Sequence, residues 1–170
     1  MAVRELSSLE KYLGLKKPNK YSTQGDKKNN NGPPLAGLAT IAHQLVKEAE
    51  RPELLGDTAE SRAVVHQWLE YSVTKLDSYT KEDIKIILKD LSLYLLDKVY
   101  LAGNQFTVAD TLMYYGIHPV MVDLTIQEKE RYVTVTRWFD HIQHHPGVRQ
   151  RLPPVLIHRN RIYMADTIEI

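Results

Sequence analysis

Three histidines near the carboxyl end of the chain are the residues best placed to do chemistry. His141, His144 and His145 stand three and four positions apart, and on a helix that spacing brings side chains onto one face. Imidazole nitrogens bind zinc, but a zinc site needs a third or fourth ligand in a fixed geometry. Asp140 is adjacent in sequence, and we expect it to point away from His144. We therefore predict half-exposed residues at a helix end rather than a metal site.

Hydroxyl and thiol groups offer no catalytic arrangement either. Ser22 and Thr23 stand in no strand-turn-helix elbow and have no suitably spaced His and Asp partners. Asn30-Asn31-Gly32 indicates a turn, and the sequence has no G-x-x-x-x-G-K phosphate-binding motif. The chain contains no Cys, hence no thiolate ligand and no disulfide. The sequence predicts a protein without catalytic residues, metal ligands or a bound cofactor.

Positive charge gathers only near the end of the chain, at Arg149, Arg151, His158, Arg159 and Arg161. The 22 Lys and Arg residues are balanced by 21 Asp and Glu, which leaves a net charge of +1. Nucleic-acid binding requires a concentrated basic surface, so we expect a solvated tail and no direct contact with nucleic acid. An RNA-binding accessory subunit that uses these residues remains the alternative.

Apolar runs in the sequence are too short to cross a bilayer. The first ten residues carry charges where a secretory signal needs an unbroken apolar stretch. We therefore expect a cytosolic protein, also present in the nucleus, that does not enter a membrane.

Helical spacing of apolar residues organises most of the chain. The pattern predicts helices over 3–13 and from 35 to about 50, with a short strand at 20–24 between them. After residue 57 it predicts a bundle of five or six helices. Four pairs match the capping box that starts a helix: Asp57 with Glu60, Thr80 with Asp83, Thr107 with Asp110, and Thr125 with Glu128. Thr134 is expected to cap the helix that carries Trp138 and Phe139.

The stretch 101–110, Leu-Ala-Gly-Asn-Gln-Phe-Thr-Val-Ala-Asp, resembles the signature in the helical half of glutathione transferases. Trp68-Leu-Glu-Tyr, Arg137-Trp-Phe-Asp-His-Ile and Pro146-Gly-Val are also similar to that family, so the likeness covers about residues 57–152. It implies that Thr107 caps a helix and that Asp110 is buried. The chemistry agrees, because Asp110 can reach back to the Thr107 N–H group.

This resemblance implies a mainly α fold with two unequal parts. Residues 1–50 would form a truncated thioredoxin-like α/β part, because a βαβ unit alone takes about 30 residues. Residues 51–57, with Pro52 and Gly56, would be a linker. An all-helical transferase-like domain would span 58–163, and 164–170 would be a tail.

Further motifs narrow the resemblance within the superfamily. They are 6–15, Lys20-Tyr-Ser, Asn30-Asn-Gly-Pro, Gln67-Trp-Leu-Glu-Tyr, Asp97-Lys-Val-Tyr-Leu, Leu124-Thr and Gln127-Glu-Lys-Glu. They are similar to scaffold subunits of the multi-aminoacyl-tRNA-synthetase complex. In two places the chain departs from that pattern: the loop 25–31 is shorter, and Asp140 stands where a Cys is expected.

The scaffold resemblance implies a non-enzymatic protein with protein partners. One face would dock a transferase-like appendage of methionyl-tRNA synthetase, and another that of glutamyl-prolyl-tRNA synthetase. ATM-type kinases in DNA-damage signalling are the implied nuclear partners. A glutathione-dependent transferase or isomerase remains the enzymatic alternative. Gly37-Leu38 counts against it, because these residues stand where active transferases bind the glutathione carboxylate with a Glu/Gln-Ser pair.

Two residues are predicted to mark the partner surfaces. Val65 lies in the second of two helices, about 35–50 and 57–76, that would flank the seam between the two parts, where we expect methionyl-tRNA synthetase. Arg137 falls in the expected first turn of its helix, where the dipole disfavours a cation. We predict that Arg137 binds a carboxylate of glutamyl-prolyl-tRNA synthetase.

Overall fold

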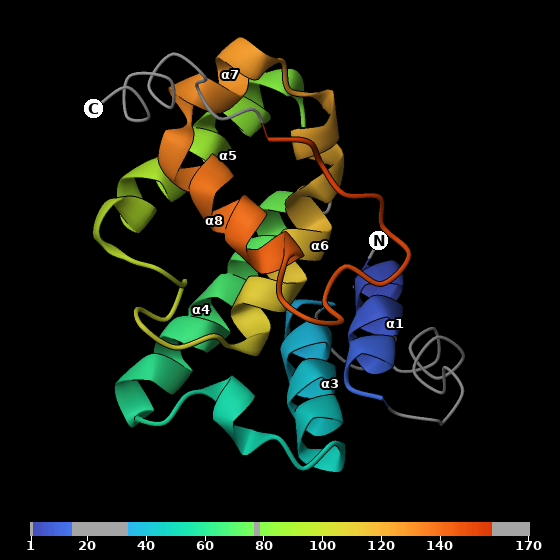
Figure 1. Cartoon of the computed structure of the whole chain (residues 1–170). Helices are drawn as coiled ribbons and strands as arrows, with labels where there is room; N and C mark the ends of the chain where they lie inside the picture. The colour runs from blue at the N-terminus through green and yellow to red at the C-terminus, as the bar shows by residue number, and fades with distance from the viewer. Residues whose placement is uncertain (1, 15–33, 77–78, 158–170) are drawn as a thin grey trace, which may run out of the picture.

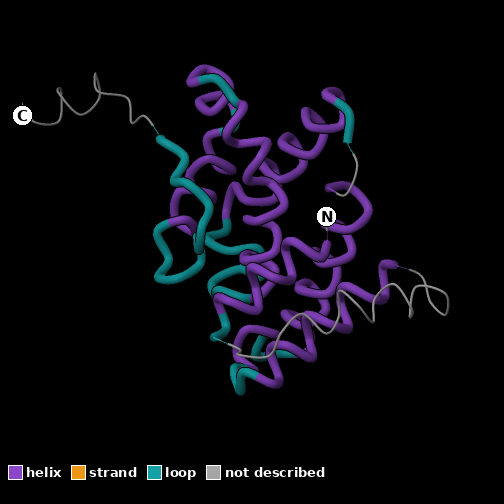
Figure 2. The backbone as a smooth tube through the Cα atoms, turned by 90° about the vertical axis from the view of Figure 1, so that its right-hand side faces the viewer, coloured by secondary structure: helices purple, strands orange, loops and turns teal. Residues whose placement is uncertain are grey.

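Helices form almost all of the ordered architecture. The computed structural model describes residues 2–14, 34–76 and 79–157. The first part contributes α1 (Ala2–Tyr12) and α3 (Pro34–Glu48), followed by the short 3-10 helix η1 (Pro52–Leu55). In the second part lie α4 (Ala59–Leu76), α5 (Lys81–Tyr94), η2 (Leu95–Asp97), α6 (Val108–Asp123), α7 (Ile126–Arg131) and α8 (Val133–Gln143). The predicted mainly α fold is confirmed, and Figure 2 shows no strand among the described residues.

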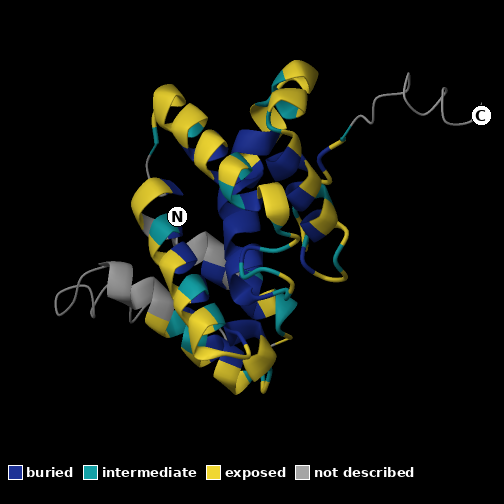
Figure 3. Cartoon of the chain, turned by 90° about the vertical axis from the view of Figure 1, so that its left-hand side faces the viewer, coloured by how far each residue is buried: buried dark blue, intermediate teal, exposed yellow. Residues whose placement is uncertain are grey.

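Helix α6 occupies the centre of the molecule. It packs against α1, α4 and α8, and Figure 3 shows it as a dark blue, buried rod surrounded by helices with yellow outer faces. Thirteen of its 16 residues are buried. A helix that is apolar all round belongs in a core, and α6 provides the frame on which the other elements are placed.

The two predicted parts share one hydrophobic core. Leu6, Leu9 and Val46 of the first part belong to the same buried cluster as Leu112 and Phe139 of the second. Residues 51–57 are therefore not a free linker, because η1 buries Leu54 and Leu55 in that core. The boundaries at 50, 58 and 163 remain predictions. The expected strand at 20–24 lies outside the described residues.

Helix starts follow the sequence signals with two corrections. The capping boxes of Thr80 with Asp83 and of Thr125 with Glu128 are present as predicted. At the start of α4 the reciprocal pair is Thr58 with Ser61, with both N–H···O distances 3.0 Å, one residue after the predicted Asp57 and Glu60. Thr134 does not cap α8 either, because the helix begins at Val133. The earlier start of α8 changes which of its residues lie in the first turn, and this affects the position of Arg137.

The segment after α8 crosses back over the bundle as an irregular strap, residues 144–157 (Figure 1). Polar side chains of the helices hold its backbone. Tyr115 Oη donates to Val148 O at 2.7 Å, and His118 Nε2 lies 2.9 Å from Pro153 O. Gln143 binds both the N–H and the C=O of Val155, each at 2.9 Å. The strap is therefore a fixed part of the fold.

Candidate partner interface

The start of α6 is organised around one buried carboxylate. Asp110 is 0% exposed. Its Oδ1 accepts from Leu101 N at 2.9 Å and from Trp138 Nε1 at 2.8 Å, while Oδ2 accepts from Thr107 N at 3.1 Å. Thr107 Oγ1 lies 3.5 Å from the same oxygen. The structure thus places Thr107 and Asp110 as the N-cap and third residue of α6, and it ties α8 to them through Trp138.

Burial sets the electrostatics of this carboxylate. Removal from water raises the pKa of Asp110 to about 6, and the hydrogen bonds to Leu101, Trp138 and Thr107 oppose the rise. At neutral pH the group is ionised and accepts from three N–H groups at once. This network has no opening to a ligand, so it positions α6 and α8 rather than binding anything itself.

Arg137 is anchored to the turn that follows α5 and does not extend freely into solvent. Its Nη2 donates to Leu95 O at 2.9 Å and to Lys98 O at 3.0 Å. Those carbonyls belong to the end of α5 and η2, where a cation is favoured by unpaired C=O groups. Helix α8 begins at Val133, so Arg137 lies beyond the first turn. The prediction that Arg137 falls in the first turn of its helix is therefore wrong. These two hydrogen bonds hold the guanidinium in place, although Arg137 as a whole is exposed to solvent.

Exposed apolar side chains occur on the elements that Arg137 joins. Leu93 is 60% exposed, Leu96 63%, Val99 50% and Val133 63%. The segments that carry them are neighbours, because Thr134 Oγ1 donates to Ser92 O at 2.8 Å and Arg137 binds the carbonyls of residues 95 and 98. We call Leu93, Leu96, Val99, Val133 and Arg137 the α5–α8 face.

Most of this face was missed from the sequence. The signal was available: α5 and η2 carry apolar residues at positions 84, 86, 87, 88, 91, 93, 95 and 96, which is more than one core-facing stripe requires. Exposed apolar groups that gather in one place, unlike scattered ones, mark interaction sites. The α5–α8 face is the candidate functional site of the molecule.

Val65 is not a surface residue. It is 0% exposed and belongs to the hydrophobic core, so the structure corrects its predicted contact with a partner. The exposed side of α4 at the seam with α3 is polar instead. His66 Nε2 lies 2.9 Å from Glu70 Oε1, and the His66 ring meets His43 of α3 edge to face at 6.4 Å.

The three histidines of α8 and its end have separate partners. His141 Nε2 lies 3.0 Å from Tyr100 Oη, and the His145 ring stacks on Phe106 at 4.0 Å. His144 Nδ1 lies 2.7 Å from Asp140 O and 3.4 Å from Asp140 Oδ1, so the prediction that Asp140 points away from His144 is wrong. Residues four apart on a helix share a face. Among residues 2–14, 34–76 and 79–157 no group of His, Asp and Glu side chains could hold a metal ion.

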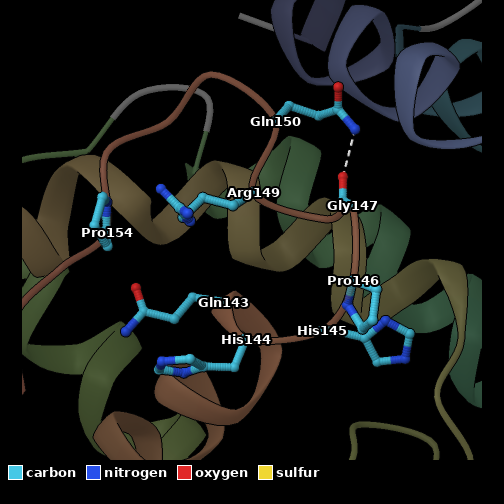
Figure 4. Close-up of a pocket in the computed structure, with 8 residues that line it drawn as sticks. All are labelled: Gln143, His144, His145, Pro146, Gly147, Arg149, Gln150 and Pro154. Atoms are coloured by element: carbon cyan, nitrogen blue, oxygen red, sulfur yellow. Dashed lines mark hydrogen bonds between the residues drawn. The ribbon is translucent and has the colours of Figure 1, made fainter.

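Several other candidates from the sequence fall outside what can be placed. The surroundings of Gly37 and the side chain of Leu38 are not described, and neither are His158, Arg159 and Arg161. No described helix is both long and apolar enough to cross a membrane. A cavity of about 380 Å³ lies beside the end of α8 (Figure 4) and is lined by Gln143, His144, His145, Pro146, Gly147, Arg149, Gln150 and Pro154.

Comparison with known proteins identifies the family. Human eukaryotic translation elongation factor 1 epsilon-1 is 58% identical over 168 residues, which cover 95% of this chain and 97% of the human protein. The chain belongs to the elongation factor 1 epsilon-1 family. A family model described as nuclear-export cofactor Arc1p also matches residues 61–146. That match covers the helical part from α4 to the end of α8.

Two more distant relatives carry a similar domain within longer proteins. The tRNA-aminoacylation cofactor arc1 of Schizosaccharomyces pombe is 26% identical over 147 residues, 86% of this chain and 28% of the cofactor. The bifunctional glutamate/proline–tRNA ligase of Drosophila melanogaster is 27% identical over 112 residues, 66% of this chain and 6% of the ligase. Domains similar to this chain therefore occur both in aminoacylation cofactors and in a synthetase itself.

Proposed function

We propose that this protein is a non-catalytic scaffold that joins aminoacyl-tRNA synthetases, and that the α5–α8 face docks one of them. The observation that carries the proposal is the occurrence of four exposed apolar side chains on the adjoining segments 93–99 and α8, which one anchored arginine joins. Interfaces favour such a composition, an apolar centre with Arg and few other charges. Similarity to a tRNA-aminoacylation cofactor and to a glutamate/proline–tRNA ligase supports a synthetase as the partner.

The geometry of Arg137 defines what the partner should offer. One terminal nitrogen, Nη2, is occupied by the carbonyls of Leu95 and Lys98. The guanidinium has donors on its other nitrogens as well, so a partner carboxylate can bind while the anchor holds the group still. A fixed guanidinium loses little side-chain entropy on binding. We therefore propose that the transferase-like domain of glutamyl-prolyl-tRNA synthetase places a carboxylate here, within an apolar contact.

A second synthetase would bind elsewhere. We propose that methionyl-tRNA synthetase docks at the α3–α4 seam, now without Val65, through exposed residues such as His66 and Glu70. Two separate faces allow one small chain to join two large enzymes. Nuclear localisation and the link to ATM-type kinases are further proposals, which rest on the family resemblance alone.

The test is the affinity of each synthetase domain for substituted chains, measured by titration calorimetry. Arg137→Ala should weaken binding of the glutamyl-prolyl-tRNA synthetase domain by about 2 kcal/mol, the scale of an interface hot spot. Arg131→Ala, at an exposed Arg of the adjacent helix α7, is the matched control and should change little. The methionyl-tRNA synthetase domain should bind both variants as it binds wild type.

Folding must be checked in parallel, because Arg137 also supports two carbonyls. Thermal melts of both variants give that control. Equal affinity of the well-folded Arg137→Ala chain for the glutamyl-prolyl domain would rule out the proposed face. A failure of either synthetase to bind wild type would rule out the scaffold function itself.

A further inference from the structure

The cavity at the end of α8 is built from a single stretch of chain. Its volume is about 380 Å³, and all of its lining residues fall between positions 143 and 154. Figure 4 shows the side chains of Arg149, Gln143 and His144 extending to one side of the loop, with Pro154 beside them. Volumes of about 300–1,000 Å³ are usual for sites that hold small ligands. The size alone is therefore compatible with a small molecule.

The walls of this cavity are held in place before any ligand arrives. Gln143 closes the loop with two hydrogen bonds of 2.9 Å to the backbone of Val155. Tyr115 and His118 bind the loop at Val148 and Pro153. Gln150 Nε2 also donates to Gly147 O within the loop. A preformed site avoids the entropy cost of ordering its walls on binding.

Arg149 is the cation of this cavity, and its charge is not neutralised by the described residues. It is half-buried, and its Nη1 donates to Leu152 O at 3.2 Å. None of the ion pairs found in residues 2–14, 34–76 and 79–157 includes Arg149. A partly desolvated charge without a counter-charge is costly. The Nε–Nη2 edge of a guanidinium offers two parallel N–H groups, which match the oxygens of a carboxylate or phosphate.

A second polar group lies on α6, the helix that holds the loop through Tyr115 and His118. Tyr114 is 0% exposed, and its hydroxyl has no hydrogen-bond partner among the described residues. Burial raises the pKa of Tyr114 to about 12, and the positive charge of Arg149 opposes the rise. A buried hydroxyl without a partner is rare and calls for an explanation. The charge of Arg149 and the hydroxyl of Tyr114 are thus not fully paired by the described residues.

We propose that this cavity binds the oxyanion of a small ligand, a carboxylate or a phosphate group, on the guanidinium of Arg149. His144 also lines the cavity, and its Nδ1 lies 2.7 Å from Asp140 O. The Asp140 carboxylate and the carbonyls at the end of α8 set a negative potential on the other side. That potential opposes anion binding, and it disfavours a highly charged ligand more than a ligand with one oxyanion. The site lies outside the α5–α8 face, so it goes beyond the proposed scaffold function.

The experiment is a titration of the isotope-labelled full chain followed by amide chemical shifts. Inorganic phosphate and acetate are added separately, with ionic strength held constant by sodium chloride. We expect saturable shifts at Gly147, Arg149 and Gln150 with at least one of the two anions. Saturation by phosphate alone identifies a phosphoryl ligand, and saturation by acetate alone identifies a carboxylate ligand. No saturable shift with either anion overturns the proposal.

Two variants and a control make the assignment specific. Arg149→Gln should weaken the anion affinity by about tenfold or more, the effect of losing a charge-assisted pair. Arg151→Gln, at an exposed position two residues away, should bind as wild type does. Pro154→Glu keeps Arg149 but adds a competing carboxylate at the edge, and it should also abolish saturation. Equal losses in Arg149→Gln and Arg151→Gln, or saturation that persists in Pro154→Glu, would show a general charge effect and overturn the site.

Discussion

The start of α6 and the α5–α8 face use polar and apolar residues in opposite ways. At α6 a charged residue is fully buried, and every oxygen of its carboxylate has donors from the chain itself. At the α5–α8 face the described residues include four large apolar side chains that are half or more exposed. The first arrangement is complete without a partner. The second becomes favourable only when another surface covers it.

This difference separates stability from function along one chain. A substitution in the Asp110 network should change folding and leave the partner surface intact in those molecules that fold. A substitution on the α5–α8 face should do the reverse. Substitutions in the two regions test this separation of stability from function, beginning with the largest expected effect on stability.

Asp110→Ala should cost the protein about 3 kcal/mol or more of unfolding free energy. The substitution leaves Leu101 N, Thr107 N and Trp138 Nε1 buried without their acceptor, and each such loss costs about 1–3 kcal/mol. Asp83→Ala is the matched control, because Asp83 occupies the same position in the exposed capping box of α5. Urea unfolding of both variants measures the difference. Equal losses for the two would mean that capping alone, and not the buried network, stabilises α6.

Local features of the fold were predictable from the sequence. A capping box joins residues three apart, so Thr80 with Asp83 and Thr125 with Glu128 could be read from spacing alone. The apolar period likewise predicted the helices, including the one that carries Trp138 and Phe139, and both of these side chains are buried. The central position of α6 follows from its nearly continuous apolar sequence.

Contacts between distant residues were the ones that the sequence could not reveal. Thr134 binds Ser92 O, 42 positions away, and so is not the cap that its residue type suggested. The carbonyls that anchor Arg137 lie 42 and 39 positions away. Val64 and Val65 are equivalent in type, but only the rotation of α4 against α6 decides that Val65 is the fully buried one. Periodicity indicates that a helix has an apolar face and leaves open which neighbour covers it.

Thr134→Asn should destabilise the protein by about 1 kcal/mol. Asn is at least as good as Thr at a true N-cap, so a capping Thr134 would tolerate the change. In the structure Thr134 is 8% exposed and its hydroxyl donates to Ser92 O at 2.8 Å, a contact that the larger amide cannot make without displacing its neighbours. Thr125→Asn is the control, because Thr125 is the N-cap of α7, and there we expect no loss. A neutral Thr134→Asn in thermal melts would return Thr134 to the capping role.

Leu96→Asn should have the smallest effect on stability, less than about 0.5 kcal/mol, because Leu96 is 63% exposed and the isolated chain buries little of it. Leu95 is the matched contrast, because it is 0% exposed. Leu95→Asn places an amide in the core, so its loss of unfolding free energy should be several-fold larger than that of Leu96→Asn. The partner assay should show the opposite order for chains that fold. Leu96→Asn removes an apolar contact beside Arg137 and should weaken binding of the glutamyl-prolyl-tRNA synthetase domain, although its melting temperature stays at the wild-type value. Calorimetric titration and thermal melts on the same samples measure both quantities. If Leu96→Asn binds as tightly as wild type, exposure of the α5–α8 face has another cause, and Arg137 must be explained by its two carbonyl contacts alone.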